Sequence, residues 1–180
     1  FSVARLVDGD LLLTGSGATP EGLRPFLRRF DLATLETQDI WRNTGEELES
    51  VIDVVSDDGS DFLTYYQSPL NPGNVKLYED GEARFITDFP DPHPELTGIK
   101  RELVTYKRAD GVELTATLYL PPDYVEGEKL PVVVWAYPRE FNDAATASQN
   151  RDSPYRFTRI GSYSHLFFLT QGYAVLDRAA

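Results

Sequence analysis

The residues best suited to chemistry follow a short apolar run. Residues 130–138 read LPVVVWAYP, and the charged residues Arg139 and Glu140 come directly after it. The phenol of Tyr137 can donate a hydrogen bond, Arg139 can bind a carboxylate and Glu140 can bind an amine. Simpler roles compete with these. Tyr137 would also serve as an aromatic residue packed at a strand end, and we favour a salt bridge within the loop for Arg139 and Glu140.

The sequence itself carries no nucleophile motif and no metal-binding motif. It has no cysteine and no G-x-S-x-G, the turn that presents a catalytic serine in α/β hydrolases. His93 lies in a proline-rich stretch and His165 on an expected helix, and we interpret both as structural. Residues 57–61 (DDGSD) lack the alternating acids of a calcium loop, so we interpret them as a turn. We expect no metal and no organic cofactor.

Charge and composition exclude several classes of partner. The 180 residues include 29 acidic and 17 basic ones, a net charge of −12. This argues against nucleic acid and an anionic membrane surface, because both need a basic patch. No apolar run approaches the roughly 18 residues of a membrane span. We expect both ends to be cut from a longer protein, which leaves compartment and oligomeric state open.

The apolar run before Tyr137 is predicted to be a buried parallel strand. Residues 132–135 are four apolar residues in succession, three of them β-branched, a pattern typical of a strand covered on both faces. Trp135 and Trp41 are accordingly interpreted as core residues. Ligands in open α/β sheets bind at the carboxyl ends of strands, so the expected site is at residues 137–140.

The next elements are predicted to be a helix and a second parallel strand. Tyr163, Leu166 and Phe167 form a helical stripe, Gly172 is suited to end the helix, and residues 173–176 are again apolar. Strand, helix and strand in this order form a βαβ unit with a right-handed crossover.

The first 90 residues are predicted to be antiparallel strands joined by turns. Asp8-Gly9 and Asp80-Gly81 are hairpin signals. A weak repeat relates Gly9 to Gly59, 50 residues later, each followed by strand, Gly/Pro loop, strand and turn. Periods of about 40–50 residues with four strands are typical of propeller blades. We favour a propeller over an ordinary meander, although two blades cannot close one.

A proline-rich stretch separates the two halves. Residues 88–94 hold three prolines in alternate positions, which favours a stiff, extended path. Beyond it, two strand-like runs flank Asp110-Gly111, another hairpin signal. We place the domains at residues 1–96 and 97–180.

Stretches of the second half resemble the beginning of the catalytic domain of prolyl oligopeptidase family serine peptidases. They are ELVTY at 102–106, RADGV at 108–112, TLYLPP at 117–122 and GYAVL at 172–176. WAYPREF at 135–141 is most similar to the glutamyl endopeptidase-like branch. The resemblance covers about residues 85–180 and is only general before them. It implies a β-propeller followed by an α/β-hydrolase domain.

This resemblance also implies an activity. The family hydrolyses peptide bonds through a Ser-Asp-His triad whose serine lies in a G-x-S-x-G turn. The implied triad lies beyond this chain, so the 180 residues alone should be inactive. The resemblance implies an oxyanion-hole role for Tyr137, through its phenol or its backbone N–H. Many relatives have a glycine pair after this position, whereas Pro138 here has no N–H, which leaves the donating atom open.

The expected architecture is thus a β-propeller fragment of antiparallel strands followed by the N-terminal part of an α/β-hydrolase domain. The expected function is serine peptidase activity on a peptide or small protein. Two alternatives stay open: a non-peptide esterase of the same fold, and a non-catalytic, propeller-linked binding module. The compartment and the preferred substrate residue are not determined by the sequence.

Overall fold

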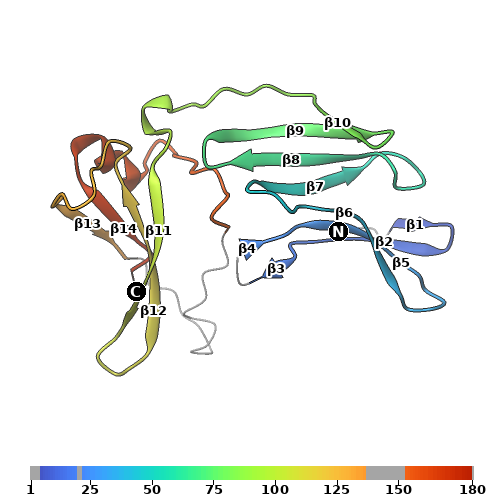
Figure 1. Cartoon of the computed structure of the whole chain (residues 1–180), viewed down its shortest axis with the longest axis horizontal. Helices are drawn as coiled ribbons and strands as arrows, with labels where there is room; N and C mark the ends of the chain where they lie inside the picture. The colour runs from blue at the N-terminus through green and yellow to red at the C-terminus, as the bar shows by residue number, and fades with distance from the viewer. Residues whose placement is uncertain (1–4, 20–21, 137–152, 180) are drawn as a thin grey trace. The chain divides into compact units, whose positions relative to one another are not determined.

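The computed structural model divides the chain into two compact units (Figure 1). The structure describes residues 5–19, 22–136 and 153–179. Of these, unit 1 contains the residues up to Pro90 together with 153–157, and unit 2 contains 91–136 and 158–179. Regular structure in the described ranges is almost entirely β-strand.

Unit 1 consists of two four-stranded antiparallel sheets and a small hairpin (Figure 1). The first sheet has the order β1-β2-β5-β6, with bounds Arg5–Val7, Asp10–Gly15, Phe26–Phe30 and Thr37–Arg42. The second has the order β10-β9-β8-β7, with β7 at Leu48–Val54, β8 at Phe62–Ser68, β9 at Asn71–Glu79 and β10 at Glu82–Phe85. The small hairpin joins β3 (Ala18–Thr19) and β4 (Gly22–Leu23). The antiparallel pairing predicted before Phe89 is confirmed for the described residues.

Two of the tight turns in unit 1 follow directly from their Asp-Gly pairs. Asp8 and Gly9 have φ of 52° and 91°, and Asp80 and Gly81 have φ of 54° and 80°. Positive φ at both central residues defines the type I′ turn, whose twist matches that of the flanking strands. Gly accepts this conformation without a steric penalty, and Asp tolerates it better than most residues. Both hairpins are therefore set by local sequence.

Aromatic side chains join the two sheets of unit 1. Trp41 from β6 contacts Phe62 and Tyr78 of the second sheet, with ring centroids 6.1 Å and 5.9 Å away. Phe62 and Tyr78 are stacked at 4.6 Å. Such pairs add about 0.5–1.5 kcal/mol beyond the area they bury. Trp41 therefore packs between the sheets, but its side chain is only half-buried, so it is not one of the buried core residues that the sequence indicated.

A buried carboxylate lies within the second sheet. Glu49 on β7 is 3% exposed. Its oxygens accept hydrogen bonds from Thr64 Oγ1 at 2.6 Å, Lys76 Nζ at 3.0 Å and Tyr78 OH at 3.0 Å. A buried charge is tolerated only when it is paired and hydrogen-bonded. These three donors, one from β8 and two from β9, meet that requirement.

Tyr78 should make unfolding of unit 1 depend on pH in the alkaline range. Burial, and next the negative charge of Glu49, raise the pKa of Tyr78 from 10.0 to about 12. The folded state therefore holds this proton more tightly than the unfolded state does. The resulting stability is fully present below about pH 10 and is lost as the pH rises toward about 12. Urea midpoints measured between these values should fall less steeply in Tyr78→Phe than in the wild type.

The matched control for that experiment is Tyr163→Phe. Tyr163 is fully exposed, at 102%, so its replacement should leave the alkaline slope as it is in the wild type. Equal slopes for Tyr78→Phe and the wild type would contradict the raised pKa.

Unit 2 is built on a mixed four-stranded sheet of order β11-β12-β14-β13. The bounds are Lys100–Lys107 for β11, Glu113–Leu120 for β12, Val132–Trp135 for β13 and Ala174–Asp177 for β14. Two 3₁₀ helices, η1 (Pro94–Leu96) and η2 (His165–Gln171), complete the unit. The hairpin around Asp110-Gly111 and the parallel pairing of β13 with β14 are both confirmed.

The buried parallel strand of this sheet is β14 and not β13, the strand that the sequence predicted to be buried. The prediction that β13 is covered on both faces is wrong for the described residues, since Val132, Val134 and Trp135 are 53%, 59% and 48% exposed. Among these residues β13 pairs only with β14 and ends the sheet, whereas β14 lies between β12 and β13. Val175 of β14 is accordingly fully buried. The interpretation of Trp135 as a core residue is wrong for the same reason.

The predicted helical stripe is also corrected. The segment forms a 3₁₀ helix that begins after Ser164, so Tyr163 lies outside it and is fully exposed. A 3₁₀ helix repeats every three residues, and the buried residues of η2 are Leu166 and Leu169. Gly172 ends the helix at φ 77°, as predicted.

Candidate active-site edge

The carboxyl ends of β13 and β14 lie side by side in unit 2. Trp135 and Asp177, the last residues of the two strands, are register partners. His165, the first residue of η2, stacks on Trp135 with ring centroids 4.6 Å apart and planes 8° from parallel. Its Nε2 lies 3.1 Å from Asp177 Oδ1. Carboxyl ends of strands are where open α/β sheets bind ligands, so this edge is the candidate site of unit 2.

The histidine and the aspartate form a partly buried pair. The side chains of His165 and Asp177 are 19% and 15% exposed. The contact is not aligned as a hydrogen bond, so its attraction comes from charge and requires a protonated imidazole. The Trp135 stack places the start of η2 against the end of β13, and the pair adds an ionic contact with the end of β14 when the imidazole is protonated. The interpretation of His165 as a structural residue agrees with these contacts.

The chain turns sharply immediately after Asp177. Arg178 has a φ of 57°, the left-handed region that few non-glycine residues adopt. Its Nε lies 3.8 Å from Asp177 Oδ2. Unusual backbone conformations concentrate at functional sites, and this one lies at the same edge as the His165–Asp177 pair.

The three site residues predicted from sequence, Tyr137, Arg139 and Glu140, lie outside the described residues. The described part of the strand reaches Ala136, directly after Trp135. The edge to which the sequence pointed is thus the one that holds the Trp135, His165 and Asp177 cluster. The roles of Tyr137, Arg139 and Glu140 themselves stay predictions.

Two serines, Ser164 and Ser153, serve the local backbone. Ser164 Oγ accepts a hydrogen bond from Leu166 N at 3.2 Å and caps η2. Ser153 is 1% exposed, and its Oγ accepts from Tyr155 N at 3.3 Å. Ser164 does not follow a strand in the way that a nucleophile turn requires.

The acidic turn at residues 57–61 is held by its own serines. Asp58 Oδ1 accepts hydrogen bonds from the backbone N and the Oγ of Ser60, at 3.0 Å and 2.8 Å.

Across the described ranges, no group of three or more His, Cys, Asp or Glu side chains is arranged to hold a metal ion. No helix within the described ranges has the length and apolar character that crossing a bilayer requires.

Sequence reasoning missed Asp177 and its pairing with His165. Asp177 could have been predicted from the sequence, because a polar side chain directly after an apolar run is the same signal that singled out Tyr137. The pairing was not, because it depends on η2 folding back over the parallel strands, which no local pattern encodes.

The fold class is shared with solved peptidase structures. Dipeptidyl peptidase 4 from Porphyromonas gingivalis matches 98% of this chain with a TM-score of 0.57 at 17% identity, and 24% of that protein is covered. The AtxE2 isopeptidase matches 94% of this chain with a TM-score of 0.53 at 22% identity, again over 24% of its length. At these identities the likeness concerns the fold alone. No protein-family model matches the chain.

Sequence similarity relates this chain to particular peptidases, whereas the structural likeness concerns only the fold. Two curated proteins named "Probable glutamyl endopeptidase, chloroplastic", from Oryza sativa subsp. japonica and Arabidopsis thaliana, are 41% and 40% identical to this chain. Each alignment covers 93% of the chain and 19% of the relative. The resemblance to prolyl oligopeptidase family serine peptidases, and within them to the glutamyl endopeptidase-like branch, is therefore confirmed.

Proposed function

We propose that the chain is part of a serine peptidase that hydrolyses peptide bonds through a Ser-Asp-His triad. The observation that carries the proposal is the 41% identity to a named glutamyl endopeptidase over 180 aligned residues. Because the chain spans only 19% of that relative, the triad is assigned to the remainder of the protein. The expected substrate is a peptide or small protein.

The architecture assigned to this part has two pieces. Residues 1–96 are the last blades of a β-propeller, and residues 97–180 are the first part of an α/β-hydrolase domain. Two consecutive four-stranded antiparallel meanders support the first assignment. A hairpin followed by a parallel strand pair supports the second. Each four-stranded sheet would then be one blade.

The candidate edge receives a role within this proposal. Tyr137 is assigned as an oxyanion-hole donor after β13, and Arg139 and Glu140 as weaker substrate contacts. The aim of such a donor is to stabilise the negative charge that develops on the carbonyl oxygen in the transition state. The His165–Asp177 pair and the Trp135 stack would keep this edge rigid.

A fluorophosphonate probe, which labels activated serines covalently, tests the proposal. The full-length protein that contains this chain should be labelled stoichiometrically, and the 180-residue chain should not be, because it contains no G-x-S-x-G. Stoichiometric labelling of the 180 residues would contradict the assignment of the nucleophile. A full-length protein that resists labelling would favour a non-catalytic binding module. One that is labelled but hydrolyses only esters would favour an esterase.

A further inference from the structure

A short turn in the crossover between β13 and η2 belongs to unit 1. Unit 1 includes residues 153–157, whereas β13 before them and η2 after them are part of unit 2. Both of those elements reach the candidate edge, where Trp135 at the end of β13 stacks on His165 at the start of η2. The chain therefore leaves this edge, contributes a turn to unit 1 and returns to the same edge. We call residues 153–157 the strap.

Local sequence shapes the strap. Its first four residues are Ser153, Pro154, Tyr155 and Arg156. The backbone N–H of Arg156 donates to the carbonyl of Ser153 at 3.2 Å, and the N–H of Tyr155 donates to Ser153 Oγ at 3.3 Å. Serine at the first position and proline at the second are both favoured in such a β-turn. The strap is therefore a formed turn, and Ser153 within it is only 1% exposed.

Two side chains of unit 1 anchor the strap. Gln67 on β8 accepts a hydrogen bond at its Oε1 from the backbone N–H of Phe157, at 3.2 Å. The guanidinium of Arg24 lies 5.1 Å from the centre of the Tyr155 ring, within the distance at which a cation is attracted to an aromatic face. The two anchors thus hold successive parts of the strap.

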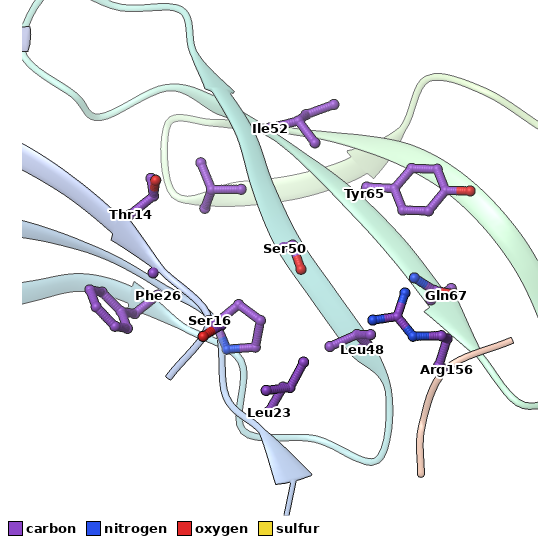
Figure 2. Close-up of a pocket in the computed structure, with 13 residues that line it drawn as sticks. Thr14, Ser16, Leu23, Phe26, Leu48, Ser50, Ile52, Tyr65, Gln67 and Arg156 are labelled. Carbon is purple, nitrogen blue, oxygen red and sulfur yellow. The ribbon is translucent and has the colours of Figure 1, made fainter. Parts of the chain in front are cut away.

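The strap approaches β4 closely and also borders a cavity. A Cβ added to Gly22 of β4 would lie 3.0 Å from Pro154 Cδ, and Gly22 has a φ of 125°, which glycine adopts without a steric penalty. The cavity has a volume of about 440 Å³, and Gln67 and Arg156 are among the residues that line it (Figure 2). Open space beside the strap means that no close packing there replaces an anchor that is lost.

The chain is held again shortly after the strap. Ile160, three residues after Phe157, is 7% exposed and belongs to the core cluster of unit 2. His165, at the candidate edge, follows five residues later. The chain is thus held in unit 1 and then in unit 2 within three residues, which leaves the stretch that leads to His165 little conformational freedom.

We propose that the strap couples unit 1 to the candidate edge, with Gln67 and Arg24 as positioning residues for the reaction. This inference rests on the peptidase function proposed above. Neither side chain touches the substrate; each seats the strap, and the seated strap fixes the crossover that begins after Trp135 and ends at His165. A misplacement of reacting groups by about 1 Å costs as much as 10²-fold in rate, so loss of the anchors should act on kcat.

Hydrogen exchange in the full-length protein tests the strap independently of any activity. Gln67→Leu removes the oxygen that accepts from Phe157 N, so this amide should exchange about fivefold faster, the effect of one lost hydrogen bond. Gln67→Glu keeps an acceptor oxygen and should restore the wild-type rate. Gln38→Leu is the matched control, because Gln38 is an exposed glutamine of β6 that does not line the cavity. Unchanged exchange in Gln67→Leu, with thermal unfolding showing that the variant is folded, would overturn the strap.

Kinetics on a peptide substrate test the positioning role. The double variant Gln67→Leu with Tyr155→Leu removes both anchoring contacts and leaves the bond from Arg24 to the Gly45 carbonyl in place. Its kcat should fall about tenfold or more, with little change in KM, because no substrate contact is lost. Gln67→Glu alone should keep the wild-type kcat, and so should Gln38→Leu.

An unchanged kcat in the folded double variant would overturn the positioning role. A raised KM with an unchanged kcat would also overturn it, because the affected side chains would then contact the substrate. The peptidase assignment can fail separately. A full-length protein that resists fluorophosphonate labelling would overturn that assignment and the positioning role with it, whereas the exchange of the Phe157 amide would still support or overturn the strap.

Discussion

Glu49→Leu is expected to lower the free energy of unfolding of unit 1 by about 3–5 kcal/mol, the range for removing one partner of a buried ion pair. The change leaves Lys76, whose side chain is only 17% exposed, without its carboxylate. It also removes the acceptor of the fully buried Thr64 hydroxyl and of the Tyr78 phenol. Urea unfolding of the wild type and the variant measures the difference.

Three further variants separate charge from packing. Glu49→Gln keeps the shape and one acceptor oxygen, so it should cost less than Glu49→Leu. The double variant Glu49→Leu with Lys76→Leu should recover much of the loss, because no unpaired charge then stays buried. The Lys76 stem also packs on Tyr66, with Nζ 4.0 Å from the ring centre, and Leu preserves part of that contact.

The matched control uses an ion pair at the surface of the same sheet. Glu79 lies 3.7 Å from Arg84, and both side chains are more than half exposed. Removing such a pair typically costs about 1 kcal/mol or less, so Glu79→Leu should be nearly neutral. A Glu49→Leu variant as stable as Glu79→Leu would show that the carboxylate is not an anchor of the sheet.

Tyr137→Phe in the full-length protein is expected to lower kcat by about 10²–10³, the range for losing one oxyanion-hole donor. KM should change little, because the interaction strengthens in the transition state rather than in the ground state. The ring is retained, so the melting temperature should stay close to that of the wild type. Steady-state kinetics on a peptide substrate and thermal unfolding measure both quantities.

Comparison with Tyr137→Ala distinguishes the possible roles of this residue. If Tyr137 only packs, the Phe variant is silent and the Ala variant loses about 3–5 kcal/mol of stability, as large core truncations do. If the backbone N–H donates, the Phe variant is again silent. An unchanged kcat for Tyr137→Phe would therefore remove the phenol from the mechanism.

Local chemistry was sufficient to predict several elements. The Asp-Gly hairpins, the glycine that ends η2 and the parallel pairing of β13 with β14 all follow from turn residues and from the order of apolar runs. The relation to glutamyl endopeptidase-like proteins was likewise present in short stretches such as LYLPP and WAYPREF.

Burial was harder to predict than strand position. Residues 132–135 and 174–176 are both apolar runs, yet only the second is the interior strand of the described sheet. An apolar run shows that the side chains of a strand can be buried. Whether they are buried depends on the number of neighbouring strands.

The amino-acid sequence by itself thus determined the strands, the turns, the chain order and the kinship of this protein. Only the tertiary structure decided which charges meet. Glu49 is satisfied by donors 15, 27 and 29 residues away, and the hydrogen bond from Phe157 N to Gln67 Oε1 spans 90 residues. Hairpins depend on the conformational preferences of adjacent residues, which a short stretch reveals. Buried ion pairs and cavities depend on distant segments that meet only after the sheets have packed.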